Sequence, residues 1–159
     1  MAAVELRRVR LGDPLVEPLL AGLAAEYHAR YGANDEMNHT EEHQFDPPSG
    51  LFLVLVSVGP DGEDMAVAGG GFRRHAPGVC EVKRMWTHPG HRRQGLAAAV
   101  LDGLEREAEA AGYRQLVLET GPRQPEAEAL YTARGYTRVP SFGPYEQSRA
   151  FSVDLTARP

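Results

Sequence analysis

The residues best suited to chemistry form a short run, Arg92-Arg93-Gln94-Gly95, directly before an apolar stretch that begins at Leu96. The first turn of a helix has backbone N–H groups without intrahelical partners, and its aligned dipoles leave partial positive charge there. Gly95 would let a ligand approach the backbone without interference from a Cβ atom. The run therefore predicts a site for a phosphate or another anion. The alternative is an ordinary loop, in which arginine and glycine are also common.

Cysteine and histidine give weaker signals for chemistry. Cys80 is the only cysteine, and because it lies in an alternating apolar stretch we interpret it as a small packed side chain rather than a nucleophile. One cysteine forms no internal disulfide, which suits a reducing compartment. His39 and His43 flank Glu42, but their surroundings lack the apolar helix of His-Glu-x-x-His zinc sites, and we predict no metal.

The anion run is part of a longer resemblance. Residues 92–97 resemble the Arg/Gln-x-x-Gly-x-Gly/Ala signature with which the GNAT family of N-acetyltransferases grips the pyrophosphate of acetyl coenzyme A (acetyl-CoA), although many members have glycine where this chain has Ala97. Residues 80–88 and 116–120 resemble the fourth and fifth strands of that family, and residues 127–136 resemble its closing helix. Correct order and spacing make this match more specific than any one motif.

The resemblance implies an acetyl-CoA-dependent N-acetyltransferase that needs no metal. It also implies that the fourth and fifth strands splay apart and that the pantetheine arm pairs with the backbone of the fourth strand. Backbone N–H groups near Thr87 would then polarise the thioester carbonyl. The residues expected to bind the cofactor are Met85, Trp86, Thr87, Arg92, Arg93, Gln94, Gly95, Leu96 and Ala97.

Transfer of an acetyl group to an amine requires a proton acceptor, because a primary amine with a pKa of about 10.4 is almost wholly protonated at neutral pH. Glu81, on the strand before the anion run, is the first candidate. Glu119, at the carboxyl end of the following strand, is the second. Glu81 could equally be a cross-strand or i to i+2 charge partner of Lys83, and a water molecule could carry the proton instead.

Tyr131 is the candidate general acid. A phenol keeps its proton at neutral pH and can give it to a leaving thiolate if the hydroxyl reaches the sulfur. The resemblance implies this role, because Tyr131 occupies the place of the family's tyrosine in the pattern Ala-Leu-Tyr-x-x-x-Gly-Tyr. The alternative is that Tyr131 only packs the last helix onto the sheet.

The acceptor is predicted to be a primary amine on a small molecule, acetylated by direct transfer in a ternary complex. Two other functions stay open, namely an inactive module that senses acyl-CoA and an acetyltransferase acting on protein N-termini or lysines. Dimers are common in the family, and a homodimer is compatible with this chain. Candidates for the acceptor pocket, each of which could instead be surface or core, are Tyr27, Tyr31, Phe45, Tyr145, Glu41 and Glu42.

The elements that must position these residues follow from hydrophobic periodicity. Strands are predicted at residues 4–11, 51–58, 65–72, 79–88, 115–119, 136–139 and 150–155, and helices at residues 13–32, 96–111 and 125–135. The strand after the second helix should run parallel to the one before it. The chain is thus predicted to be a single α/β domain over residues 1–159, with helices on both faces of the sheet. The resemblance adds that this mixed sheet is mostly antiparallel.

Finer expectations concern single faces. Alternation places Glu81 and Met85 on one face of their strand and Trp86 on the other. Helical periodicity places Glu105 on the polar side of the second helix. The glycines at 69–71 suggest a bulge or close packing, and the stretch 33–50 suggests a short helix or a lid over the substrate.

Composition excludes several partners. The chain has 159 residues and a formal net charge of -5, whereas nucleic-acid-binding domains normally carry a basic excess. No apolar run approaches the roughly 20 residues that span a bilayer. The first residues lack the apolar core of a signal peptide, which predicts a cytoplasmic protein without membrane or nucleic-acid partners.

Overall fold

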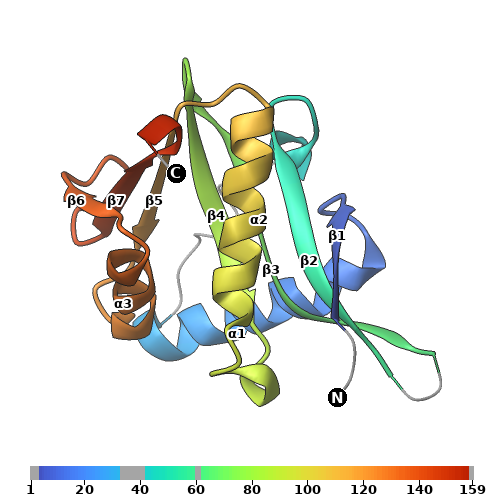
Figure 1. Ribbon diagram of the computed structural model, residues 1–159. Helices are drawn as coiled ribbons and strands as arrows, with labels where there is room; N and C mark the ends of the chain where they lie inside the picture. Colours follow the sequence, from blue (N-terminus) through green and yellow to red (C-terminus); the bar gives the residue numbers. More distant parts are fainter. Residues whose placement is uncertain (1–3, 33–41, 60–61, 158–159) are drawn as a thin grey trace.

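The computed structural model describes residues 4–32, 42–59 and 62–157. Short 3-10 turns lie at Pro14–Val16, Glu42–Phe45, Pro89–His91 and Leu155–Ala157. None of the helices in the described part of the chain is long and apolar enough to cross a membrane. The strands are β1 (Val4–Val9), β2 (Leu51–Val58), β3 (Asp64–Ala76), β4 (Val79–Thr87), β5 (Gln115–Thr120), β6 (Thr137–Val139) and β7 (Arg149–Asp154), and the helices are α1 (Glu17–Tyr31), α2 (Leu96–Ala110) and α3 (Pro125–Ala133) (Figure 1).

The seven strands form one mixed sheet in the order β1-β2-β3-β4-β5-β7-β6. All neighbouring strands are antiparallel except β4 and β5. These two are parallel because α2 carries the chain back to the end of the sheet from which β4 starts. The mixed, mostly antiparallel sheet and the parallel crossover are therefore confirmed.

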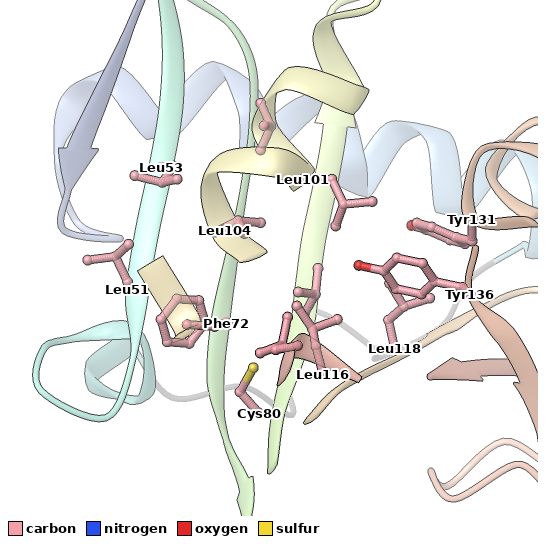
Figure 2. Close-up of a cluster of buried hydrophobic side chains, with 14 of the residues drawn as sticks. Leu51, Leu53, Phe72, Cys80, Leu101, Leu104, Leu116, Leu118, Tyr131 and Tyr136 are labelled. Atoms are coloured by element: carbon pink, nitrogen blue, oxygen red, sulfur yellow. The ribbon is translucent and has the colours of Figure 1, made fainter. Parts of the chain in front are cut away.

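The helices cover both faces of the sheet, as predicted. Alternate residues of β2 point to opposite faces, so Leu53 packs in the cluster beneath α2 while Phe52 packs in the cluster beneath α1. Figure 2 shows the α2 cluster, in which Leu101 and Leu104 from the helix meet Leu116 of β5. The lone cysteine, Cys80, is buried in the same cluster.

A β-bulge interrupts β4 in the middle of the sheet. Over the stretch Lys83–Trp86, β4 has one residue more than the stretch Gly69–Gly71 of β3 that pairs with it. Arg84 absorbs the extra residue with a backbone φ of 65°, in the left-handed region that non-glycine residues rarely adopt. The glycines opposite also approach neighbours closely, since a Cβ at Gly71 would lie 2.5 Å from the Phe52 ring.

The bulge corrects the predicted faces of β4. Because one extra residue reverses the alternation, Met85 packs against the α2 cluster together with Val82. Trp86 turns to the α1 side, where it joins the other cluster. The prediction that Glu81 and Met85 share a face is wrong for this reason.

β4 and β5 pair only along their first halves. Their register runs from Val79 opposite Gln115 to Val82 opposite Leu118, although β4 continues to Thr87. The two strands therefore separate beyond this point, as the resemblance implied. The separation leaves the second half of β4 with β3 as its hydrogen-bonded neighbour among the described residues.

The polar side predicted for α2 is partly wrong. Glu105 is only 2% exposed, and its carboxylate contacts Arg134 and Tyr136, which follow α3. Helical periodicity in α2 cannot register a covering segment that lies about thirty residues further along the chain. The burial of Glu105 is a tertiary effect.

Candidate active site

A cavity of about 1210 Å³ opens where β4 and β5 separate. Its wall is built by α1, the bulged half of β4, the first turn of α2, the end of β5, α3 and the loop 142–148. Nearly all the site residues predicted from the sequence line it, because the strands that carry them meet at this gap. The exception is Gln94, which is exposed and lies outside the wall.

One end of the cavity is suited to an anion. Gly95 precedes α2 with φ 75°, and no side chain caps the helix. In the described part of the chain, the backbone ladder of α2 begins with the N–H of Ala99 on the Gly95 carbonyl at 3.1 Å. This leaves the N–H groups of residues 96–98 without an intrahelical acceptor, and the anion site predicted from the sequence stays a prediction.

The two arginines beside this turn differ in their contacts. Arg92 lies 3.3 Å from the Glu26 carboxylate of α1, and its Nε donates to the Thr87 carbonyl at 3.4 Å. Arg93, with a backbone φ of 64°, makes no ion pair within the described residues. Both line the cavity. Of the two guanidinium groups, that of Arg93 is the one that no carboxylate in the described part of the chain engages.

The stretch Met85–Thr87, predicted to face the pantetheine arm, borders the gap between β4 and β5. Trp86 and Thr87 pair with Gly69 and Ala68 of β3 on one edge, and β5 contributes no pairing on the other edge. The Trp86 side chain is buried against α1. Among the described residues, this edge of β4 at Met85–Thr87 therefore has no paired strand.

Glu81 has a cross-strand partner that the sequence analysis did not name. Its Oε1 accepts from Arg73 Nε at 3.2 Å and from Arg73 Nη2 at 3.1 Å, and its side chain is almost buried. His75 Nδ1 lies 4.0 Å from the same oxygen. Arg73 and Glu81 stand at equal distances from the turn at 76–78, so the hairpin was the signal that could have identified the pair. Glu81 is therefore a charge partner, as one interpretation held, but its partner is Arg73 and not Lys83.

Glu119 lies at the far end of β5, beneath the loop between β6 and β7. Its Oε2 accepts from Ser141 Oγ at 2.8 Å. Gly143 approaches so closely that a Cβ there would lie 2.2 Å from Glu119 Oε1. Glu119 therefore anchors this loop as well as lining the cavity.

Tyr131 is a buried tyrosine in the cavity wall, 5% exposed. Its ring packs against Tyr136 and Phe151 at centroid distances of 5.7 and 5.6 Å. Figure 2 shows the Tyr131 hydroxyl pointing from α3 toward β4. Burial, with a smaller contribution from Tyr27, raises the pKa of this phenol well above its usual value. The hydroxyl accordingly keeps its proton.

The residues suggested for the acceptor pocket divide. Tyr27 and Tyr145 line the cavity, whereas Phe45 is fully buried in the α1 cluster and takes no part in it. The side chains of Tyr31 and Glu42, and all of Glu41, lie outside what the structure describes. His39, one of the two histidines considered and rejected as metal ligands, lies there too, while His43 Nδ1 lies 3.0 Å from the Asp46 carboxylate.

The chain is similar to known proteins at three levels. The sequence profile of the acetyltransferase (GNAT) family matches residues 19–136. The IAA acetyltransferase of Azospirillum brasilense is 43% identical over 68 residues, so the chain spans less than half of that relative, 44% of its length, and the match covers 43% of this chain.

Solved structures extend the likeness to the whole fold. A Klebsiella pneumoniae protein, provisionally described as an acyl-CoA N-acyltransferase, is 29% identical with a TM-score of 0.76 over 98% of this chain and 99% of that one. A Salmonella typhimurium protein, YncA, was solved with its cofactor acetyl-CoA; it is 16% identical with a TM-score of 0.70 over 98% and 96%. At that identity the second likeness concerns the fold alone.

Proposed function

Because this chain belongs to the acetyltransferase (GNAT) family, we propose that it transfers an acetyl group from acetyl-CoA to a primary amine of a small molecule. The transfer is direct, within a ternary complex. One observation carries the proposal: the first turn of α2, which is suited to an anion, and Tyr131, whose buried phenol keeps its proton, line the same cavity at the gap between β4 and β5. If a thioester that carries phosphates lies along this gap, its phosphates meet the first turn of α2 and its sulfur lies toward Tyr131.

The residues present fit acetyl-CoA as a cosubstrate. The N–H groups at residues 96–98 and the guanidinium of Arg93, which has no ion pair among the described residues, suit a diphosphate. The backbone of Met85–Thr87 offers a strand edge to an extended arm that carries amides. Gln94 does not line the cavity, so the fit does not depend on it. Acetyl-CoA supplies the activated acetyl group as a thioester.

The protein's part in the reaction is to hold and move protons. Tyr131 donates its hydroxyl proton to the sulfur as the carbon–sulfur bond breaks, because burial keeps that proton in place at neutral pH. The amine must lose a proton in exchange. Glu81, Glu119 or a water between them and the amine accepts it, as both carboxylates line the cavity. Backbone N–H groups near Thr87 stabilise negative charge on the acyl oxygen.

The decisive experiment combines a panel of amines with a change of Tyr131 to phenylalanine. Thiol release from acetyl-CoA is measured with polyamines, amino acids, aminoglycosides and lysine-containing peptides. The Tyr131→Phe variant should lose about 100-fold or more in kcat, while calorimetry finds an unchanged Kd for coenzyme A. Tyr113→Phe is the matched control, since that buried tyrosine donates to the Ser49 carbonyl outside the cavity.

The outcomes separate the candidate functions. Release with peptides alone would mean a protein acetyltransferase. Binding of coenzyme A without release for any amine would favour an acyl-CoA-sensing module. A Tyr131→Phe variant with the kcat of the parent protein would refute the role of Tyr131 as the acid.

A further inference from the structure

The mechanism proposed above leaves the buried carboxylate of Glu105 unexplained. Glu105 projects from the middle of α2 and is 2% exposed. Its Oε2 accepts from the Tyr136 hydroxyl at 2.6 Å, and its Oε1 accepts from Arg134 Nη2 at 2.7 Å. Burying a carboxylate is costly unless both oxygens are hydrogen-bonded to strong donors. This one is satisfied by two residues from a distant segment.

The two donors, Arg134 and Tyr136, lie directly after the end of α3. The backbone N–H groups of Arg134 and Tyr136 both donate to the Tyr131 carbonyl, at 3.2 and 3.0 Å. The same segment therefore touches Glu105 through its side chains and Tyr131 through its backbone. Any shift of this segment relative to α2 moves the backbone from which the Tyr131 ring projects.

The aromatic rings of Tyr131 and Tyr136 form a second connection between Glu105 and Tyr131. Tyr131 and Tyr136 lie 5.7 Å apart with an interplanar angle of 36°, and Figure 2 shows both hydroxyl ends pointing the same way. The Tyr136 hydroxyl is held at a fixed point of α2 by a short bond to a charged oxygen, a geometry tighter than packing alone provides. The Tyr136 ring thus restricts the positions that the Tyr131 ring can adopt.

We propose that Glu105 is a positioning residue for Tyr131, acting through Arg134 and Tyr136. It joins the helix whose first turn receives the cosubstrate to the segment that carries the acid, so that the hydroxyl stays in reach of the sulfur. The inference rests on the proposed function, because it assigns Glu105 to the orientation of the general acid.

Glu105 acts on Tyr131 by fixing its position and not by changing its pKa. Burial and Tyr27 account for the raised pKa of Tyr131, and Glu105 is not among the causes. A glutamine at 105 can accept from Arg134 through its oxygen and donate to the Tyr136 oxygen through its amide, which retains both connections. An alanine retains neither. The conservative variant should consequently restore what the truncation removes.

The test is a double-mutant cycle on kcat. Glu105→Ala and Glu105→Gln are each made in the parent protein and in Tyr131→Phe. Glu105→Ala should lower kcat about tenfold in the parent protein, because small misplacements of a reacting group are costly, with KM for acetyl-CoA unchanged. In Tyr131→Phe the same change should have less than about a twofold effect. Glu105→Gln should retain most of kcat.

A matched truncation controls for lost stability. Leu104→Ala removes a fully buried side chain one residue earlier on α2, in the same cluster. It should lower the melting temperature without lowering kcat at temperatures where the protein is folded. If circular dichroism shows Glu105→Ala to be unfolded, Tyr136→Phe replaces it in the cycle, with the same results expected.

Each other outcome overturns the inference. An unchanged kcat in Glu105→Ala, or equal losses in both backgrounds, would show that Glu105 does not act through Tyr131, and the proposed acetyl transfer would stand. An unchanged kcat in Tyr131→Phe would remove the acid role and the positioning role together.

Discussion

The two arginines at the start of α2 are expected to contribute unequally to the proposed binding of a diphosphate. Arg92 is already paired with Glu26 and with the Thr87 carbonyl, whereas Arg93 has no ion pair within the described residues. A guanidinium that must first leave a carboxylate contributes less net binding energy than one that needs only to shed water. Arg93 is expected to contribute more to affinity.

We expect Arg93→Ala to raise the Kd for coenzyme A about tenfold, since hydrogen bonds to charged groups contribute roughly 1.5–3 kcal/mol. Arg92→Ala should have a smaller effect. Calorimetry with coenzyme A and with pantetheine, which lacks the phosphates, separates the contributions: pantetheine binding should not change. Arg114→Ala, an exposed arginine outside the cavity, is the control. A larger loss from Arg92→Ala would contradict the order.

At the scale of elements, the packing of α1 on β4 depends on a glycine. A Cβ on Gly22 would lie 2.3 Å from Trp86 Cζ2, inside the ring's van der Waals boundary. Trp86 is buried and belongs to the stretch that borders the cosubstrate gap. The helix therefore sits as close to β4 as its backbone permits.

This contact reverses the usual sign of a substitution. Glycine to alanine within a helix ordinarily stabilises by about 0.5–1 kcal/mol, but Gly22→Ala should lower the free energy of unfolding by about 1–3 kcal/mol through overpacking. Urea denaturation measures the change. Adding Trp86→Leu should relieve the clash, so that Gly22→Ala becomes stabilising in that background. A stabilised single variant would show that α1 and β4 adjust freely.

Two local features of β4, a bulge and the end of its pairing with β5, also shape the cavity. The bulge at Arg84 changes which side of β4 faces α1, and the end of β4–β5 pairing at Val82 opens the gap. Both features lie within three residues of each other. The opening thus begins close to the point where β4 is locally distorted, and the loop that Glu119 holds through Ser141 borders its other side.

For the whole molecule, buried neutral acids predict how stability depends on alkaline pH. Burial raises the pKa of the Cys80 thiol from 9.0 to about 12, and burial raises the pKa of both Tyr131 and Tyr136 above the ordinary 10.0. In this range the native state holds more protons than the unfolded state, so the free energy of unfolding falls as pH rises. These contributions are complete below about pH 9.

Urea midpoints measured between pH 8 and pH 11 should accordingly stay level to about pH 9 and then decline, with a loss of a few kcal/mol by pH 11. Cys80→Ala, which removes the group with the lowest ordinary pKa, should shift the onset toward pH 10 after allowance for its lower starting stability. A midpoint that stays level to pH 11 would mean that these groups titrate normally in the folded protein.

Much of the fold, and the helix start that forms one end of the candidate site, could be predicted from the sequence alone. Gly32, Gly95 and Gly135 mark helix boundaries with positive φ, and Pro125 begins α3. Each of these depends on interactions within a few residues, which the sequence states directly. The turn at the start of α2 belongs to this class, since N–H groups without intrahelical acceptors follow from where a helix begins.

Only the tertiary structure decided the contacts between distant segments. The bulge at Arg84 reversed a face assignment, Arg73 took the place of Lys83 beside Glu81, and the segment after α3 buried Glu105. In each case the contact depends on how two strands pair or on a distant segment that packs over the residue. Neither of these produces a periodic pattern in the local sequence. The sequence by itself therefore determined where helices start and which residues can react, and the packing of the sheet decided which of them meet.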